Sequence, residues 1–260
     1  MIGAHLSATA PLSDIIYNME SLGLETFQVF TRNPRSTKQR YVSDQELALF
    51  NTELMRHGVS QFVVHAPYTI NPCSPEKSKR DFAYKIISED MQFLSRICGK
   101  ISYVLHPGHH MGDGAVEGMK RLSDLLHQLS NIPVTICVET MSGAGSELIY
   151  SAYEVLNLMN MCRDINVRLT FDTCHVYASG QVLVDAYQLM KRFVQVVHLN
   201  GSKNPYQSYT DRHSNLAYGC IPMDWLEGVV KMIDKDIPII LETPSADFLN
   251  DIKLLKSFVT

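Results

Sequence analysis

Eight short runs of β-branched and aromatic residues recur along the chain, and each is followed by a stretch whose apolar residues repeat with helical spacing. This alternation indicates repeated β-α units around a parallel sheet. The eight runs are Ile2 to His5, Thr26 to Phe30, Phe62 to His65, Tyr103 to His106, Val134 to Glu139, Leu169 to Asp172, Val194 to His198 and Ile237 to Glu242. Near-continuous apolar strands suit a closed barrel or an open doubly wound sheet, and eight units favour the barrel.

The length of the chain agrees with one barrel. Its 260 residues lie close to the ~250 that are typical of a (β/α)8 TIM barrel. No Pro/Gly/Ser-rich linker or low-complexity tract interrupts the pattern, so we predict an α/β fold with a single domain over residues 1–260. The longest irregular stretch runs from Asn200 to Pro222 and is expected to serve function, because long loops in compact domains usually do.

Charge and cysteine content restrict the partners and the compartment. The formal net charge of -4 and pI near 6.2 give no global attraction to nucleic acid, so a polyanionic partner would need local patches or bound cations. The six cysteines form no Cys-x-x-Cys pair, which predicts reduced thiols and an intracellular, cytoplasmic protein. No stretch approaches the ~20 apolar residues of a membrane span and the first residues lack a signal-peptide pattern, so no membrane partner is expected.

Six of the eight runs end on a residue that can bind a metal ion: His65, His106, Glu139, Asp172, His198 and Glu242. In a barrel these residues meet at one rim, because parallel strands bring their C-terminal ends to the face where barrel active sites lie. Any one of them alone could be an ordinary polar residue at a strand end. A cluster of carboxylates at one rim would repel itself unless cations neutralise it, so the set predicts a hydrolytic site with several metal ions. The first run ends on His5, a candidate to support such a site from behind the ligands.

Two further pairs of candidate ligands lie just beyond strand ends. His175 follows Asp172 by three residues, so both side chains can aim inward if a turn of helix follows the strand. The long irregular stretch supplies Asp211 and His213. Histidine and carboxylate ligands without thiolates suit Zn²⁺, Mn²⁺ or Fe²⁺, and we interpret Cys174 as a packing residue.

These motifs, in this order, resemble the endonuclease IV family of apurinic/apyrimidinic endonucleases, also called AP endonuclease family 2, which has a xylose-isomerase-like TIM barrel. The resemblance runs from Gly3-Ala4-His5-Leu6-Ser7 to Leu241-Glu242-Thr243-Pro244. Between these lie His65 with Tyr68 and Asn71, His106-Pro107-Gly108, Glu139-Thr140, Asp172-Thr173-Cys174-His175, His198-Leu199-Asn200 and Asp211-Arg212-His213. Two sites depart from the family: its Ala-Gly-Gly after the first strand reads Thr9-Ala10-Pro11, and Gly201 replaces a frequent Asp.

The resemblance implies three divalent metal ions, most often Zn²⁺, which Mn²⁺ or Fe²⁺ can replace in part. The implied ligands are His65, His106 and Glu139 for the first ion, Glu139 as a bridge with Asp172, His198 and Glu242 for the second, and His175, Asp211 and His213 for the third. Glu139 and Glu242 are the residues to which we assign a catalytic role. Three divalent ions would bring the formal charge of -4 to about +2, which would let an acidic chain bind DNA.

The resemblance also implies a DNA-repair activity on double-stranded DNA. The reaction would hydrolyse the phosphodiester 5′ to an abasic site and leave a 3′-hydroxyl, and the enzyme would also remove groups that block 3′ ends. Zn²⁺ lowers the pKa of bound water to ~7, so a metal-bound hydroxide could attack phosphorus without a side-chain base. We expect a monomer, which would leave the rim free for DNA.

A basic stretch after the second run contains Arg32 and Arg35 at the predicted rim. A stretch of this kind is more often a solvated face than a binding site. The resemblance implies instead that Arg35 and Tyr68 penetrate the DNA. Arg32, Lys203 and Arg212 are further candidates for contacts with DNA, the last two with phosphates.

The competing interpretation is a sugar isomerase or epimerase of the xylose-isomerase-like barrels. Such an enzyme binds a single metal ion through a Glu, an Asp, a His and a Glu from successive strands. Glu139, Asp172, His198 and Glu242 would suffice for it, and the other five candidate ligands would be surplus. The extra imidazoles therefore favour three ions. A non-catalytic DNA-binding protein is weaker still, since binding alone does not need so dense a ligand cluster.

Overall fold

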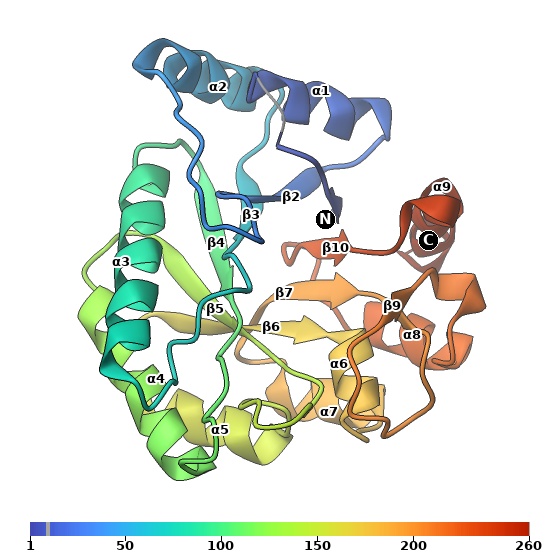
Figure 1. The fold of residues 1–260 in the computed structure, drawn as a ribbon. Helices are drawn as coiled ribbons and strands as arrows, with labels where there is room; N and C mark the ends of the chain where they lie inside the picture. Colours follow the sequence, from blue (N-terminus) through green and yellow to red (C-terminus); the bar gives the residue numbers. More distant parts are fainter. Residues whose placement is uncertain (9–10, 260) are drawn as a thin grey trace.

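A closed parallel barrel forms the centre of the computed structural model, which describes residues 1–8 and 11–259 (Figure 1). Around the barrel the strands follow the order β1-β10-β7-β6-β5-β4-β3-β2, and each pairs in parallel with its neighbours. They are β1 Ile2–His5, β2 Thr26–Phe30, β3 Gln61–His65, β4 Lys100–Leu105, β5 Thr135–Glu139, β6 Val167–Asp172, β7 Val194–Leu199 and β10 Ile239–Leu241. The predicted (β/α)8 TIM barrel is confirmed.

The strand bounds differ from the predicted runs by one or two residues at several ends. His106 and Glu242 lie one residue beyond β4 and β10, for example, and β6 starts two residues before the predicted Leu169. The reason is that hydrogen-bonded pairing with a neighbour defines a strand, whereas the sequence shows only the apolar content. The departure from the family at Thr9 and Ala10 lies outside the described residues.

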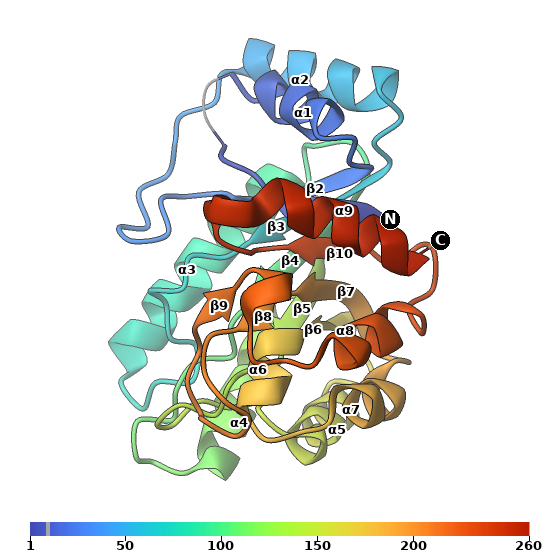
Figure 2. The same cartoon turned by 90° about the vertical axis from the view of Figure 1, so that its right-hand side faces the viewer.

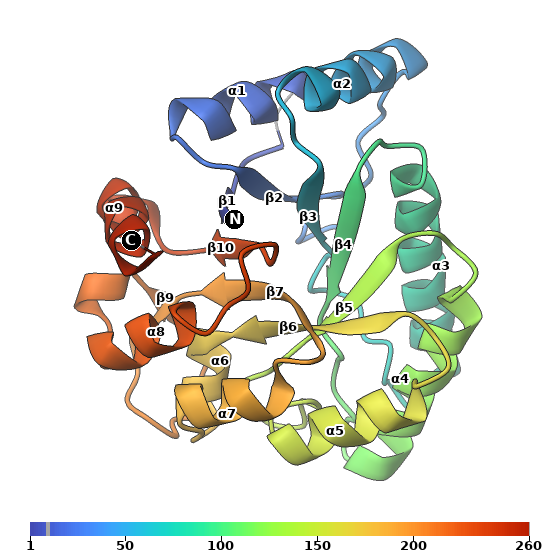
Figure 3. The ribbon, with the colours of Figure 1, turned by 180° about the vertical axis from the view of Figure 1, so that it is seen from behind.

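Helices surround the barrel on its outer side (Figure 1 and Figure 3). They are α1 Ser13–Ser21, α2 Asp44–Arg56, α3 Lys77–Leu94, α4 Ala115–Leu129, α5 Ala152–Met161, α6 Thr173–Ala178, α7 Leu183–Met190, α8 Met223–Val230 and α9 Phe248–Val259, with the 3-10 turn η2 Ser245–Asp247 before the last. The N-cap of α2 is Ser43, whose hydroxyl accepts a hydrogen bond from the backbone N–H of Glu46 at 3.1 Å. This contact satisfies one of the free N–H groups at the start of the helix.

The stretch from Asn200 to Pro222 is more ordered than the sequence predicted. It contains the antiparallel pair β8 Gly201–Ser202 and β9 His213–Ser214, followed by the 3-10 turn η1 Leu216–Tyr218. The hairpin lies beside α6, which follows β6 at the same rim (Figure 2). Strands of two residues carry no measurable periodicity, which is why the sequence predicted only a loop.

The buried residues divide into two layers. One lies between the strands and the surrounding helices and includes the fully buried rings of Phe27, Phe62, Tyr103 and Phe171. The other fills the barrel interior and consists of Val63, Val104, Cys137, Val196 and Ile240. Among the described residues, no helix has the length and apolar character needed to cross a membrane.

Candidate metal centre

The inward positions of the strands build the rim of the barrel. Strand side chains alternate between two faces, so a residue two positions after an interior residue also points into the barrel. Two positions after the five members of the interior layer come His65, His106, Glu139, His198 and Glu242. The β6 end adds Asp172, whose register partner on β7 is His198. Strand periodicity therefore brings six predicted ligands to one level.

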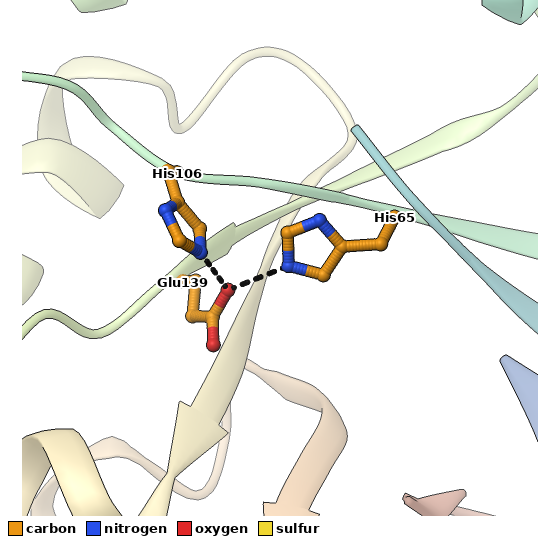
Figure 4. Close-up of side chains that lie close together, drawn as sticks. All are labelled: His65, His106 and Glu139. Atoms are coloured by element: carbon orange, nitrogen blue, oxygen red, sulfur yellow. Dashed lines mark hydrogen bonds and ion pairs between the residues drawn. The ribbon is translucent and has the colours of Figure 1, made fainter. Parts of the chain in front are cut away.

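The first group of candidate ligands is His65, His106 and Glu139 (Figure 4). The Nε2 atoms of the two histidines approach the same oxygen, Glu139 Oε2. The distance is 3.2 Å for His65 and 3.0 Å for His106. His65 Nδ1 lies 2.7 Å from the carbonyl oxygen of Ala66, which can only accept a hydrogen bond. In the neutral ring, Nε2 of His65 therefore carries a lone pair that faces a carboxylate, an arrangement that a cation stabilises.

The second group joins Glu139 to Asp172, His198 and Glu242. His198 Nδ1 lies 2.8 Å from Glu139 Oε1, 3.2 Å from Glu242 Oε2 and 3.9 Å from Asp172 Oδ2. Glu139 thus turns one carboxylate oxygen to the first group and the other oxygen to the second. Its placement matches that of a bridging ligand.

The third group is His175, Asp211 and His213. The Nε2 atoms of the two histidines are buried and lie 3.3 Å from different oxygens of Asp211, yet neither has a hydrogen-bond partner among the described residues. His175 Nδ1 lies 2.8 Å from the carbonyl oxygen of Thr140, so Nδ1 is the donor and Nε2 carries the lone pair of the neutral ring. Two buried nitrogens without hydrogen-bond partners beside one carboxylate fit the donor set of a divalent metal.

Local hydrogen bonds fix the two elements that carry the histidines of the third group. Asp172 caps α6, because its Oδ1 accepts the backbone N–H of His175 at 2.7 Å. The cap fixes the first turn of the helix and with it the direction of the His175 side chain. His213 is the first residue of β9 and pairs with Ser202 of β8. Next to this pair, the Lys203 N–H donates a hydrogen bond of 2.8 Å to the Arg212 carbonyl oxygen.

Imidazoles and carboxylates in the centre shift one another's pKa values. Burial alone would lower the pKa of His198, but the carboxylates of Glu242 and Glu139 outweigh it and raise the pKa to about 9. Burial opposes the shift of Glu139, yet His198 holds the pKa of that carboxyl well below its usual range. Burial would also raise the pKa of Asp211, but His175 outweighs it and lowers that pKa to about 2. Without a metal, protons on the imidazoles balance the carboxylates, and these are the charges that divalent ions would replace.

Cys174 lies close enough to Asp172 and His213 to form a further candidate group with them. It is fully buried, and burial raises the pKa of its thiol to about 12. Only the thiolate is a metal ligand. We therefore keep the interpretation of Cys174 as a packing residue.

A cavity of about 360 Å³ opens over the three groups. Its wall includes Tyr68, a ring that is 48% exposed and meets Phe30 edge-on at 6.2 Å. Of the other predicted DNA contacts, Arg35, Lys203 and Arg212 are exposed, the first in the segment after β2 and the other two on the hairpin side of the rim. The structure thus leaves three cations and one ring open to solvent on the rim side of the barrel, and their contact with DNA stays a prediction.

Arg32 occupies a different environment from the one the sequence predicted. Only 6% of the residue is exposed, and its guanidinium donates to Asp90 and, at 2.7 Å, to Glu89 of α3. Asp90 also accepts hydrogen bonds from Thr31 at 2.7 Å and Tyr103 at 2.9 Å. The guanidinium is thus held by two carboxylates of α3. These bonds anchor the loop that carries Arg32, and its contact with DNA stays a prediction.

The anchored loop borders a second cavity, of about 690 Å³, which is bounded by β2, β3 and the helices α1, α2 and α3. This cavity is lined mostly by apolar residues and by none of the nine candidate ligands, and it adjoins the cavity over the metal centre, with which it shares His5 and Phe30. Arg32 pairs with Gln39 across the base of the loop. The loop that carries Arg35 is therefore fixed at its base, beside a region that side chains do not fill.

Two residues of the site were missed by the sequence reasoning. Asn200 donates to Asp172 Oδ2 at 2.7 Å and accepts the backbone N–H of Glu242 at 3.1 Å. Gln28 lies inside the barrel on β2 and contacts His198, Glu242 and His5. A polar residue at an inward position of an apolar strand was the signal that could have revealed Gln28. His5, the predicted support of the site, does reach it, with Nδ1 3.7 Å from Glu242 Oε1.

Comparison with known proteins first defines the class. A family model described as a xylose isomerase-like TIM barrel matches residues 16–258, so the chain is a barrel of this class. The crystal structure of a D-tagatose 3-epimerase-like protein superposes with a TM-score of 0.78 and 18% identity over 99% of this chain and 96% of that one. At that identity the likeness shows the fold alone.

Two other relatives narrow the assignment. A probable endonuclease 4 from Clostridium beijerinckii is 33% identical over 276 residues, which cover 98% of each chain. The crystal structure of endonuclease IV from Thermus thermophilus superposes with a TM-score of 0.85 and 25% identity over 99% of this chain and 98% of that one. The chain belongs to the endonuclease IV family, as its motifs predicted, and the prediction that it is a nuclease is confirmed.

Proposed function

We propose that this protein is an apurinic/apyrimidinic endonuclease that acts through three divalent metal ions, with Zn²⁺ as the best match to the ligand types. It would hydrolyse the phosphodiester 5′ to an abasic site in double-stranded DNA, leave a 3′-hydroxyl and also clear blocking groups from 3′ ends. The observation that carries the proposal is the division of the ligands into three adjoining groups, two of which share Glu139. We further propose that residues 1–260 act as a single domain and as a monomer.

The residues present fit these ions. Three groups offer nine different side chains, all nitrogen or carboxylate donors: His65, His106, Glu139, Asp172, His175, His198, Asp211, His213 and Glu242. Hydrogen bonds on the far side of the rings orient His65 through Ala66 and His175 through Thr140. Outer hydrogen bonds of this kind fix ring orientation and tautomer in metal sites.

Bound there, divalent ions would lower the pKa of a coordinated water and stabilise negative charge on the phosphate oxygens. The protein side chains would hold and orient these ions. Glu139 holds its two oxygens toward two groups at once, and Glu242 faces the second group from the end of β10, the strand that pairs with the β7 of His198. Their roles as catalytic residues are thus to bind and orient at the reacting centre rather than to shuttle protons.

Selectivity for abasic DNA would come from the rim. A nucleotide without a base has lost its stacking energy, so rotating it out of the duplex costs less. The half-exposed ring of Tyr68 and the exposed Arg35 are suited to occupy the gap that remains, and Lys203 and Arg212 to contact phosphates. The cavity of about 360 Å³ over the ligands would receive the extruded sugar.

A one-ion sugar isomerase or epimerase remains the alternative, because barrels of that kind share the fold. Glu139, Asp172, His198 and Glu242 form one group that would meet its needs. The first and third groups would then have no purpose. In the third group the histidine Nε2 atoms are buried and form no hydrogen bond with any residue that the structure describes, which argues for metal ligands there and against this alternative.

The proposal is tested with a duplex that carries one tetrahydrofuran abasic analogue, which cannot undergo β-elimination. Metal-loaded protein should cut this duplex on the 5′ side of the analogue and leave an end that a polymerase extends. A matched duplex with a 3′-phosphate should become extendable too. If loaded protein leaves the tetrahydrofuran duplex intact but interconverts a ketose with its epimer, the alternative replaces the proposal.

A further inference from the structure

Gln28 stands in the barrel interior on β2, a strand that supplies none of the candidate ligands. It is completely buried, and its register partners are His5 on β1 and Val63 on β3. A buried amide in an apolar strand is costly unless both of its ends are hydrogen-bonded. Its contacts therefore decide what the residue does.

Three side chains of the site meet the Gln28 amide. The Nε2 atom donates to Glu242 Oε1 and lies 2.9 Å from His5 Nδ1. The Oε1 atom lies 2.8 Å from His198 Nε2. Both N–H groups and the carbonyl oxygen of the amide are thus hydrogen-bonded, each to a different side chain.

The chemistry of these neighbours fixes the direction of every bond. The carboxylate of Glu242 can only accept, so it must face the NH₂ group of Gln28. The carbonyl oxygen is then left for His198 Nε2, which must carry the proton and donate it. In the neutral ring the lone pair of His198 is therefore on Nδ1, the atom that lies 2.8 Å from Glu139 Oε1 and 3.2 Å from Glu242 Oε2.

We infer that Gln28 is a positioning residue of the metal centre: its amide selects the Nε2–H tautomer of His198 and fixes the orientation of Glu242, so that Nδ1 and Oε2 face the second group of ligands. The inference rests on the proposed metal-dependent function. It assigns a role to β2, one of the two barrel strands that contribute no ligand. It also explains the position of His5, whose Nδ1 accepts the remaining N–H of the amide.

If Gln28 had only a structural role, its substitution would lower the stability of the fold and nothing else. If it is a positioning residue, its substitution should lower the metal affinity of one group of ligands. Gln28→Met keeps length and apolar volume but removes all three hydrogen bonds. Removal of outer hydrogen bonds at metal sites typically costs about 10- to 100-fold in metal affinity. We expect one of the three bound ions to dissociate about 10- to 100-fold more readily, and the other two to keep their wild-type affinity.

Gln61→Met is the matched control. Gln61 is also a buried glutamine in a barrel strand, but it stands at the start of β3, four residues before His65, and its Nε2 has no hydrogen-bond partner among the described residues. Its substitution should leave the affinities of all three ions within about twofold of wild type. Chelator competition with Zn²⁺-loaded protein, followed by elemental analysis, measures each loss without any reference to activity.

A second variant distinguishes the role of the amide oxygen from that of the amide NH₂ group. It also provides a test if Gln28→Met does not fold. Gln28→Glu retains an oxygen that accepts from His198 but places another oxygen against Glu242. In metal-free protein above pH 9, where the imidazole is neutral, the Nε2–H tautomer of His198 should persist in ¹⁵N spectra, while one ion again binds more weakly. In a folded Gln28→Met variant the ¹⁵N spectra should show loss of this tautomer preference.

The results distinguish the inference from the function on which it rests. If wild type binds three ions and the Gln28 variants bind all three equally well, the inference is wrong and the metal centre stands. The same holds if Gln61→Met loses an ion to the same extent as Gln28→Met. If wild-type protein binds no Zn²⁺, the proposed function itself fails.

Discussion

Glu139 is the residue on which two groups of ligands depend. Its Oε2 atom is shared by His65 and His106, and its Oε1 atom faces His198. Because the side chain is almost completely buried, its charge can be balanced only by neighbouring cationic groups. Glu242 is placed in a similar way, with Oε2 toward the second group and Oε1 toward Gln28.

Glu139→Gln and Glu242→Gln test these two positions at constant side-chain size. Each change removes a negative charge and turns one carboxylate oxygen into a donor, so incision of abasic DNA should fall by more than about 100-fold. Affinity for uncut abasic duplex, measured by fluorescence anisotropy, should change far less. Parallel losses of binding and incision would mean that the variants are unfolded, and full incision by either variant would contradict the assignment.

The pKa of His198 gives the metal-free protein a characteristic dependence on pH. The folded-state pKa of about 9 lies above the ordinary value of 6.5, so this group stabilises the folded state fully below pH 6.5. That contribution is lost as the pH rises through about 9. Metal-free protein should therefore show a falling Tm between these values, and the slope should shrink in His198→Gln. A Tm of metal-free wild type that rises over this interval would contradict the ion pairs described here.

At the scale of elements, the segment after β2 joins the barrel to the part of the rim that we propose binds DNA. Arg32 holds the base of this loop through Asp90 and Glu89 of α3, and Arg35 extends from it into solvent. The buried pair orders the loop in advance, which reduces the entropy that binding must overcome. In the proposed function Arg35 would then contact DNA without any role in holding metal.

Arg35→Ala should accordingly weaken binding of abasic duplex by about 5- to 100-fold while leaving the metal content unchanged. Arg163→Ala is a suitable control, because Arg163 is also exposed but follows α5 and precedes β6, at the opposite end of the barrel. Its removal should have little effect on DNA affinity. A loss of bound metal in Arg35→Ala, or equal losses of affinity in both variants, would contradict the placement of Arg35 on the DNA-facing side.

The elements also show what the sequence could and could not predict. Strand periodicity was sufficient to predict that His65, Glu139 and His198 share one level, because inward positions repeat every second residue along parallel strands. The sequence could not predict the burial of Arg32, which depends on a carboxylate 58 residues away on α3. Gln28 was missed for a related reason, since its three partners come from other strands.

At the scale of the whole molecule, the barrel serves as a rigid support for ligands that lie far apart in the sequence. His65 and Glu242 are separated by most of the chain, yet both reach one cavity. The hairpin β8–β9 supplies His213 from outside the barrel, and Asp211 lies just before that strand. A site assembled from so many elements depends on closure of the whole barrel, so its metal content reports on the complete fold as well as on the nine side chains.

The most direct test of the account is a titration of metal-free protein with Zn²⁺, in which bound metal and incision of a tetrahydrofuran duplex are measured on the same samples. Three groups of ligands that act together predict saturation at about three equivalents per chain, with incision appearing only as the last equivalent binds. Saturation at one equivalent, or full incision by protein that holds a single ion, would contradict the three-metal centre.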